Sequence, residues 1–166
     1  MSGKPIGRQV TVVTKFQTEA IRPGGVDRRT AGKAAEQAVS DMQVQVQARV
    51  LGSLEPLVAL LRQWRQDAPA ERLRGACDWA ATTRDLAGLA EMHLLTEVAM
   101  HSYDCLDAVA VDGASMDAKE AACFADALAF ARQDTCRGSD LAPYQPLLKD
   151  LETLATLVIE RGTQAR

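Results

Sequence analysis

Apolar residues recur along most of this chain at steps of three and four, the spacing that places them on one face of an α-helix. The pattern is clear from about Arg28 onwards, where Ala35, Val39, Met42 and Val46 follow it. Polar residues occupy most of the positions between them, so the segment is amphipathic. We therefore predict that the chain becomes helical at about Arg28.

The segment that follows leaves alternatives open. The run over residues 43–47 also alternates with a period of two, as a half-buried strand would. Gly52 and Pro56 interrupt the helical period, so Ser53 could cap a separate helix that ends near Trp64. The other interpretation is one continuous helix with a kink at this point.

Turn and capping signals divide the rest of the chain into four further predicted helices. Gly113 suits the left-handed position after a helix end, and Ser115 suits the N-cap of the next helix. Pro143 and Pro146 are tolerable only in the first turn of the last helix. The four predicted helices are a short one ending near Thr82, one over residues 84–111, one capped by Ser115, and a last one with an apolar stripe of Leu147, Leu151, Leu154 and Val158.

Composition agrees with this helical pattern. The chain has 166 residues, of which 47% are hydrophobic and 4% aromatic. This length is enough for the core of one domain, and frequent alanine and leucine favour closely packed helices over a sheet. We predict an all-α fold, an antiparallel bundle of four to five helices over residues 28–166, with a flexible N-terminal arm over residues 1–27.

The predicted arm is basic and has no helical period. It contains the helix breakers Pro23, Gly24 and Gly25, and residues 1–35 hold seven basic and two acidic residues in a chain of net charge −3. Such an arm could associate with nucleic acid or an anionic surface, although it lacks interleaved aromatics and no recognition helix accompanies it. Nucleic-acid association is therefore kept as an alternative function.

Both histidines of the chain fall on one polar stripe of the predicted helix over residues 84–111. His93, Glu97, His101 and Asp104 lie within an arc of roughly 80° at about 100° per residue. A solvated helix face needs no further explanation, and this is the interpretation we favour. The alternative is a His-centred site for a metal ion or a small ligand.

The spacing within this stripe argues against sharper chemistry. His93 and His101 are two turns apart, about 12 Å of helix rise, too far for one zinc ion with bonds near ~2.0 Å. One histidine with Glu97 could supply two ligands, but the rest would have to come from another helix or subunit. Phosphorylation of either histidine is opposed by the acidic neighbours Glu97 and Asp104.

A second candidate site combines an aromatic and two basic residues. Arg62, Trp64 and Arg65 end an apolar stripe, and tryptophan and arginine are common anchors of protein interfaces. Alternatively, Trp64 covers the end of the helical core and the two arginines are simply solvated. The four cysteines show no metal-ligand spacing, so we expect them to be reduced and mostly buried.

No sequence motif in this chain names a reaction. There is no nucleophile elbow, no phosphate-binding loop and no dinucleotide fingerprint. No stretch approaches about 20 apolar residues, and the N-terminus lacks the order of a signal peptide. We therefore expect a cytoplasmic, non-enzymatic helical module without a cofactor or a membrane span. It would bind another protein as an adaptor, chaperone or regulator and form a homo-oligomer.

Overall fold

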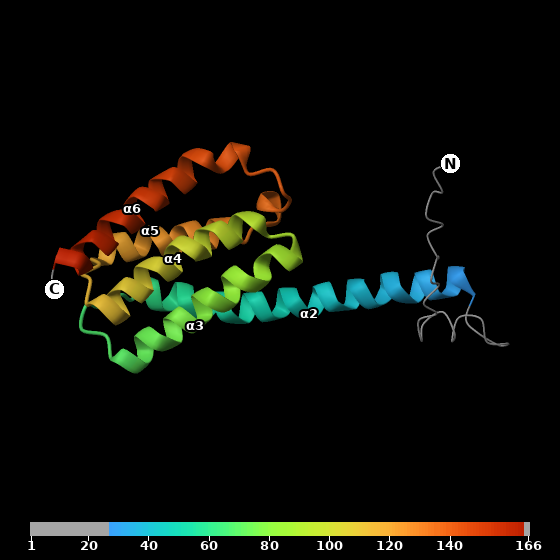
Figure 1. The fold of residues 1–166 in the computed structure, drawn as a ribbon, viewed down its shortest axis with the longest axis horizontal. Coiled ribbons are helices and arrows are strands. Elements are labelled where there is room, and N and C mark those ends of the chain that lie inside the picture. The colour runs from blue at the N-terminus through green and yellow to red at the C-terminus, as the bar shows by residue number, and fades with distance from the viewer. Residues whose placement is uncertain (1–26, 165–166) are drawn as a thin grey trace, which may run out of the picture. The chain divides into compact units, whose positions relative to one another are not determined.

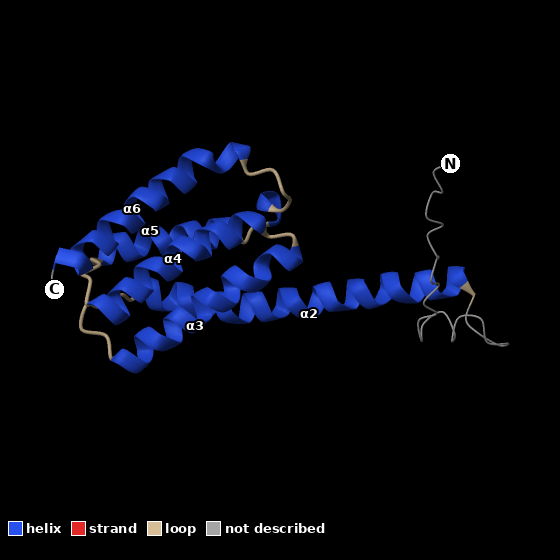
Figure 2. Cartoon of the chain, in the orientation of Figure 1, coloured by secondary structure: helices blue, strands red, loops and turns tan. Residues whose placement is uncertain are grey.

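The computed structural model of the chain describes residues 27–164, and within them all regular structure is helical (Figure 2). No strand occurs in this part of the chain, so the all-α fold class is confirmed. The predictions for the N-terminal arm concern residues that, apart from Asp27, lie outside the described ones. The five α-helices are α2 (Arg28–Arg62), α3 (Ala70–Ala87), α4 (His93–Asp112), α5 (Ala118–Ala131) and α6 (Gln145–Gln164).

Helix α2 is continuous, which decides between the alternatives left by the sequence. Pro56 lies inside the helix, and Ser53 does not cap a new one. Instead, the Ser53 hydroxyl donates a hydrogen bond of 3.2 Å to the carbonyl oxygen of Arg49. Leu54 and Leu57 are fully buried, and burial of each side chain contributes about 1.5–3 kcal/mol, against a cost of about 3 kcal/mol for the proline. Burial of the apolar face therefore outweighs the break.

The chain divides into two units, Met1–Ser40 and Asp41–Arg166, and the hydrophobic core belongs to the second. Within that unit, α4 is the central helix and packs against α3, α5 and α6 (Figure 1). Small residues on α5, including Ala121 and Ala125, are fully buried and permit close packing of its neighbours. The largest fully buried side chains include Leu54, Leu57, Leu61, Leu94, Leu95, Leu106, Met92, Met116, Phe124 and Leu128.

The predicted single helix over residues 84–111 is wrong. Helix α3 runs on to Ala87, a 3-10 turn follows, and α4 begins after Met92. Glu91 adopts a left-handed conformation with φ of 59°. The Met92 N–H then donates to the carbonyl oxygen of Ala87 at 2.9 Å, and the Glu91 N–H donates to Gly88 at 3.1 Å. These are the two hydrogen bonds of a Schellman helix end, which the sequence hides because the left-handed residue is not glycine.

The C-terminal end of α4 agrees with the prediction, whereas the N-terminal end of α5 differs from it. Gly113 is left-handed, with φ of 68°, and ends α4 as predicted. The N-cap of α5 is Asp117 and not Ser115. Asp117 accepts hydrogen bonds from the N–H groups of Lys119 and Glu120, and the Glu120 side chain accepts from the Asp117 N–H. This reciprocal capping box satisfies more donors than a single serine hydroxyl could.

Helix α2 also meets a membrane-span criterion by length and composition alone. A window of 18 residues within it reaches a mean hydropathy of 1.2. A core helix of a soluble protein passes the same test, and 39% of this window is buried inside the fold. The window is therefore weak evidence for a membrane span.

Candidate functional site

The four residues of the predicted polar stripe share one face of α4. His93, Glu97 and His101 are half-buried, and Asp104 is exposed. The face is therefore less solvated than the sequence suggested. In the described part of the chain, no hydrogen bond or ion pair of their side chains joins these four residues.

The stripe is not assembled into a metal centre within residues 27–164. No group of three or more histidine, cysteine, aspartate or glutamate side chains in this range could hold a metal ion. His93 and His101 are the two histidines of the chain, and they lie two turns apart on one helix. A zinc site needs at least three protein ligands around one point, so these residues alone do not form one.

A basic residue lies near the stripe that sequence reasoning missed. The guanidinium of Arg84, on α3, sits 4.7 Å from the centre of the Tyr103 ring on α4. A hydrogen bond from Arg84 to the Asp85 carboxylate, 2.8 Å long, raises the pKa of Arg84, and the charge of Asp104 adds to this effect. The predicted continuous helix placed Arg84 well before Tyr103 along one axis. The turn before α4 instead brings the two side by side.

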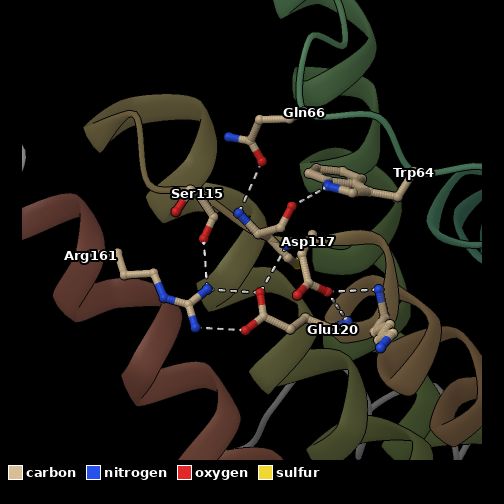
Figure 3. A network of polar contacts seen from close by, with 8 residues as sticks. Trp64, Gln66, Ser115, Asp117, Glu120 and Arg161 are labelled. Carbon is tan, nitrogen blue, oxygen red and sulfur yellow. Dashed lines mark hydrogen bonds and ion pairs between the residues drawn. The ribbon is translucent and has the colours of Figure 1, made fainter.

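Trp64 is part of the core and contacts the connection between α4 and α5 (Figure 3). Its side chain is 7% exposed, and its Nε1–H donates a 2.6 Å hydrogen bond to the carbonyl oxygen of Met116. Gln66 accepts from the Met116 N–H at 3.0 Å and donates to the carbonyl oxygen of Ala114 at 3.3 Å. The segment after α2 thus holds the connection between α4 and α5. This geometry matches the core interpretation of Trp64.

The two arginines beside Trp64 are exposed and point to different partners. Arg62 pairs with Asp126 on α5, and Arg65 pairs with Asp67, each at 3.3 Å. Ion pairs this exposed contribute little to stability. Trp64 and Arg65 line a cavity of about 300 Å³ together with Arg72, but Arg62 does not reach it. The structure therefore places Trp64 in the core and the two neighbouring arginines in separate exposed ion pairs.

The connection between α4 and α5 lies near a second polar contact, between α5 and α6. Arg161 binds both carboxylate oxygens of Glu120, at 2.7 and 2.8 Å, and also donates to the carbonyl oxygen of Ser115 at 3.2 Å (Figure 3). This hydrogen bonding lowers the pKa of Glu120 below its ordinary value of 4.5. The N-cap was predicted at Ser115, so neither the Asp117–Glu120 capping box nor its partner on α6 was predicted.

The Glu120–Arg161 contact predicts a specific acid sensitivity. Because folding lowers the pKa of Glu120, its contribution to stability is present above pH 4.5 and is lost as the pH falls further. Replacement Glu120→Gln should lower the free energy of unfolding by about 1–2 kcal/mol at neutral pH. Urea denaturation at several pH values should show the difference from wild type shrinking below pH 4.5. A difference that stays constant across this range would contradict the assignment.

Two of the four cysteines are poorly suited to act as nucleophiles. All four are free, and Cys105 and Cys136 are buried, Cys77 is partly buried and Cys123 is exposed. Burial raises the pKa of Cys105 to about 12 and that of Cys77 to about 11. Both thiols are therefore protonated at neutral pH, and only the thiolate is a nucleophile.

Among the exposed apolar surfaces of residues 27–164, two have features that suit a partner, and the first is on α2. Its stripe of Ala35, Val39, Met42 and Val46 is the one that predicted the helix, and we call it the α2 stripe. Val39 is 53% exposed and Met42 is 57% exposed, while Val46 is half-buried. Further along the same helix, Val50 continues the period and is fully buried. The stripe thus has the apolar chemistry of a core, but it is largely exposed within residues 27–164.

The second apolar surface is a hollow of about 430 Å³ between α5 and α6, which we call the α5–α6 groove. Phe130 is 40% exposed in it and meets the Tyr144 ring edge-on, with 6.1 Å between the ring centres. The sequence did not predict this groove, because its two walls come from different helices and the apolar period of each helix does not show how the two pack. Its lining consists of Cys123, Ala127, Phe130, Leu147, Leu151 and Leu154, with Asp126 and Asp150 also contributing.

Comparison with known proteins assigns no family to this chain. No family model matches it, and neither a curated protein nor a solved structure does. The function must therefore be inferred from the surfaces of the molecule itself, above all from the α2 stripe and the α5–α6 groove.

Proposed function

We propose that this chain is a cytoplasmic, non-enzymatic helical module that acts by binding protein, as an adaptor, chaperone or regulator, and that it forms a homo-oligomer. The observation that carries the proposal is the exposed α2 stripe. Val39 and Met42 continue the apolar period that fills the core further along the same helix. The two alternatives, a His-centred ligand site and nucleic-acid association through the N-terminal segment, remain predictions.

An uncovered stripe on a long helix is a physical reason to expect a partner. Helix α2 has 35 residues, and the side chains described over residues 29–45 are all exposed. Most of the stability of a helix in a protein comes from packing of its amphipathic face, and over residues 29–45 this face is exposed. Covering Val39 and Met42 would remove apolar surface from water, at about 25 cal/mol per Å², and would also hold the helix together. Binding and helix stability are thereby linked.

The fold that presents this stripe is proposed to be an antiparallel bundle. Three contacts between helix ends support it. Trp64, after α2, bonds to Met116 before α5, and Gly162 in α6 lies where an added Cβ would be 3.0 Å from Ala114 after α4. The Gly138 N–H donates to the carbonyl oxygen of Glu91, which joins the segment before α6 to the turn before α4. Consecutive helices then alternate in direction.

The proposal is tested with a matched pair of substitutions on α2. Met42→Glu places a carboxylate on the α2 stripe, whereas Val44→Glu makes the same chemical change two residues later, about 160° around the helix. Val44 is 65% exposed, so the control should not disturb the fold. Sedimentation velocity should show wild type and Val44→Glu assembled, and Met42→Glu with affinity reduced at least about tenfold, because a charge would be buried in an apolar contact.

Two results would overturn the proposed function. One is a wild-type protein that stays monomeric at every concentration and captures no protein through the stripe. The other is Met42→Glu assembling as wild type does, because the stripe would then take no part in the contact.

A further inference from the structure

We propose that the α5–α6 groove receives the α2 stripe of a second copy of this chain, and that the exchange is reciprocal and closes a dimer. The inference rests on the proposed function, because it names the partner of the same stripe. Both surfaces are apolar and exposed in the single chain. Each offers what the other lacks, a ridge of side chains on one side and a hollow on the other.

The spacing of the stripe suits a groove between two helices. An amphipathic helix binds such a groove through residues at steps of three and four, as Ala35, Val39, Met42 and Val46 are placed. The floor of the groove is apolar, with Leu151 at 4% exposure and Phe130 at 40%. A methionine at the centre of the stripe can adapt to an irregular hollow.

Charges at the edges of the two surfaces are complementary. Arg49 follows Val46 by three residues on the same face of α2 and is exposed. Asp150 lines the groove and is also exposed, and neither residue forms an ion pair within residues 27–164. The other acidic residue of the groove, Asp126, is paired only with the exposed Arg62. A basic end of the stripe therefore meets an acidic rim, an arrangement that favours this orientation of the partner.

A contact between two different surfaces of one chain must either close or propagate. One such contact leaves a free groove on one copy and a free stripe on the other, and repetition gives a filament. Reciprocal exchange satisfies both stripes and both grooves in a dimer and doubles the buried area toward the roughly 1,200–2,000 Å² of stable interfaces. The competing arrangement pairs stripe with stripe and leaves the groove empty.

Mixing two variants separates these arrangements. Met42→Glu puts an anion on the stripe, and Cys123→Arg puts a cation in the groove at a position that is exposed in the single chain. We expect each variant alone to lose at least about tenfold in dimer affinity by sedimentation velocity. In their equimolar mixture, each heterodimer has one unaltered contact and one contact that pairs Glu with Arg. The mixture should therefore form dimers where neither variant does.

Two control variants and one replacement variant complete this experiment. Val44→Glu and Thr156→Arg lie away from the two surfaces and should dimerise as wild type does. If Cys123→Arg loses its helical circular dichroism, the rim variant Asp150→Arg replaces it, with a several-fold loss of affinity expected. If the groove variant dimerises as wild type does while Met42→Glu stays monomeric, the groove is not the binding site for the stripe. The stripe would then contact another surface of the second copy. If Met42→Glu also dimerises normally, the proposed function itself fails.

Discussion

Replacement of Trp64 by alanine is expected to lower the free energy of unfolding by about 3–5 kcal/mol. The side chain is 7% exposed, so its removal leaves a cavity at the end of the core. It also leaves the Met116 carbonyl oxygen without the 2.6 Å hydrogen bond from the indole. Trp64→Phe keeps most of the buried surface but removes the donor, and should cost about 1–2 kcal/mol. Urea denaturation monitored by far-ultraviolet circular dichroism measures both values.

Substitution at the neighbouring arginine provides the control for Trp64. Arg62 is exposed and its pair with Asp126 is solvated, so Arg62→Ala should change stability by no more than about 0.5 kcal/mol. A loss below about 1 kcal/mol for Trp64→Ala would contradict the core position and would favour Trp64 as an exposed anchor for a partner.

Leu151→Asp should destabilise the fold by roughly 4 kcal/mol or more, because it combines a lost apolar side chain with a buried, unpaired carboxylate. Leu151 is 4% exposed on the inner face of α6. Leu154 belongs to the same predicted stripe but is only half-buried, so Leu154→Asp should cost clearly less. Thermal unfolding of the two variants, followed side by side with wild type, measures the difference.

The order of these two effects tests the register of α6. Its fully inward positions are Leu148, Leu151, Ala155, Val158 and Gly162. Equal losses at Leu151 and Leu154 would mean that the inward face is rotated toward the predicted stripe. Wild-type stability in both variants would contradict packing of α6 on the core altogether.

The helices were predictable where apolar period and turn chemistry agree. The period from Ala35 through Val46 located α2, and Gly113 located the end of α4. The turn before α4 was not predictable, because its left-handed residue is Glu91 and no glycine or proline marks that position. Pro56 left two alternatives open, because the sequence shows a local helix breaker but not the burial that outweighs it in the folded chain.

Features that lie on a single helix could be predicted from the sequence, and features that need two helices to pack together could not. A periodic pattern places His93 and His101 on one face and gives the α2 stripe, because each needs only one helix. Contacts between two different helices cannot be read from the apolar period of either helix. The Arg84–Tyr103 contact, the Glu120–Arg161 pair and the α5–α6 groove all depend on which helices become neighbours. Exposure of the stripe could likewise be known only from the fold.

Hydrogen exchange of the backbone amides over residues 35–44, measured at increasing protein concentration, tests the central claim most directly. If a partner copy covers the α2 stripe, exchange in this segment should slow as the concentration rises, both in wild type and in Val44→Glu. In Met42→Glu it should stay fast at every concentration, while the buried segments of α4 remain protected. Exchange over residues 35–44 that is independent of concentration in wild type would contradict the account.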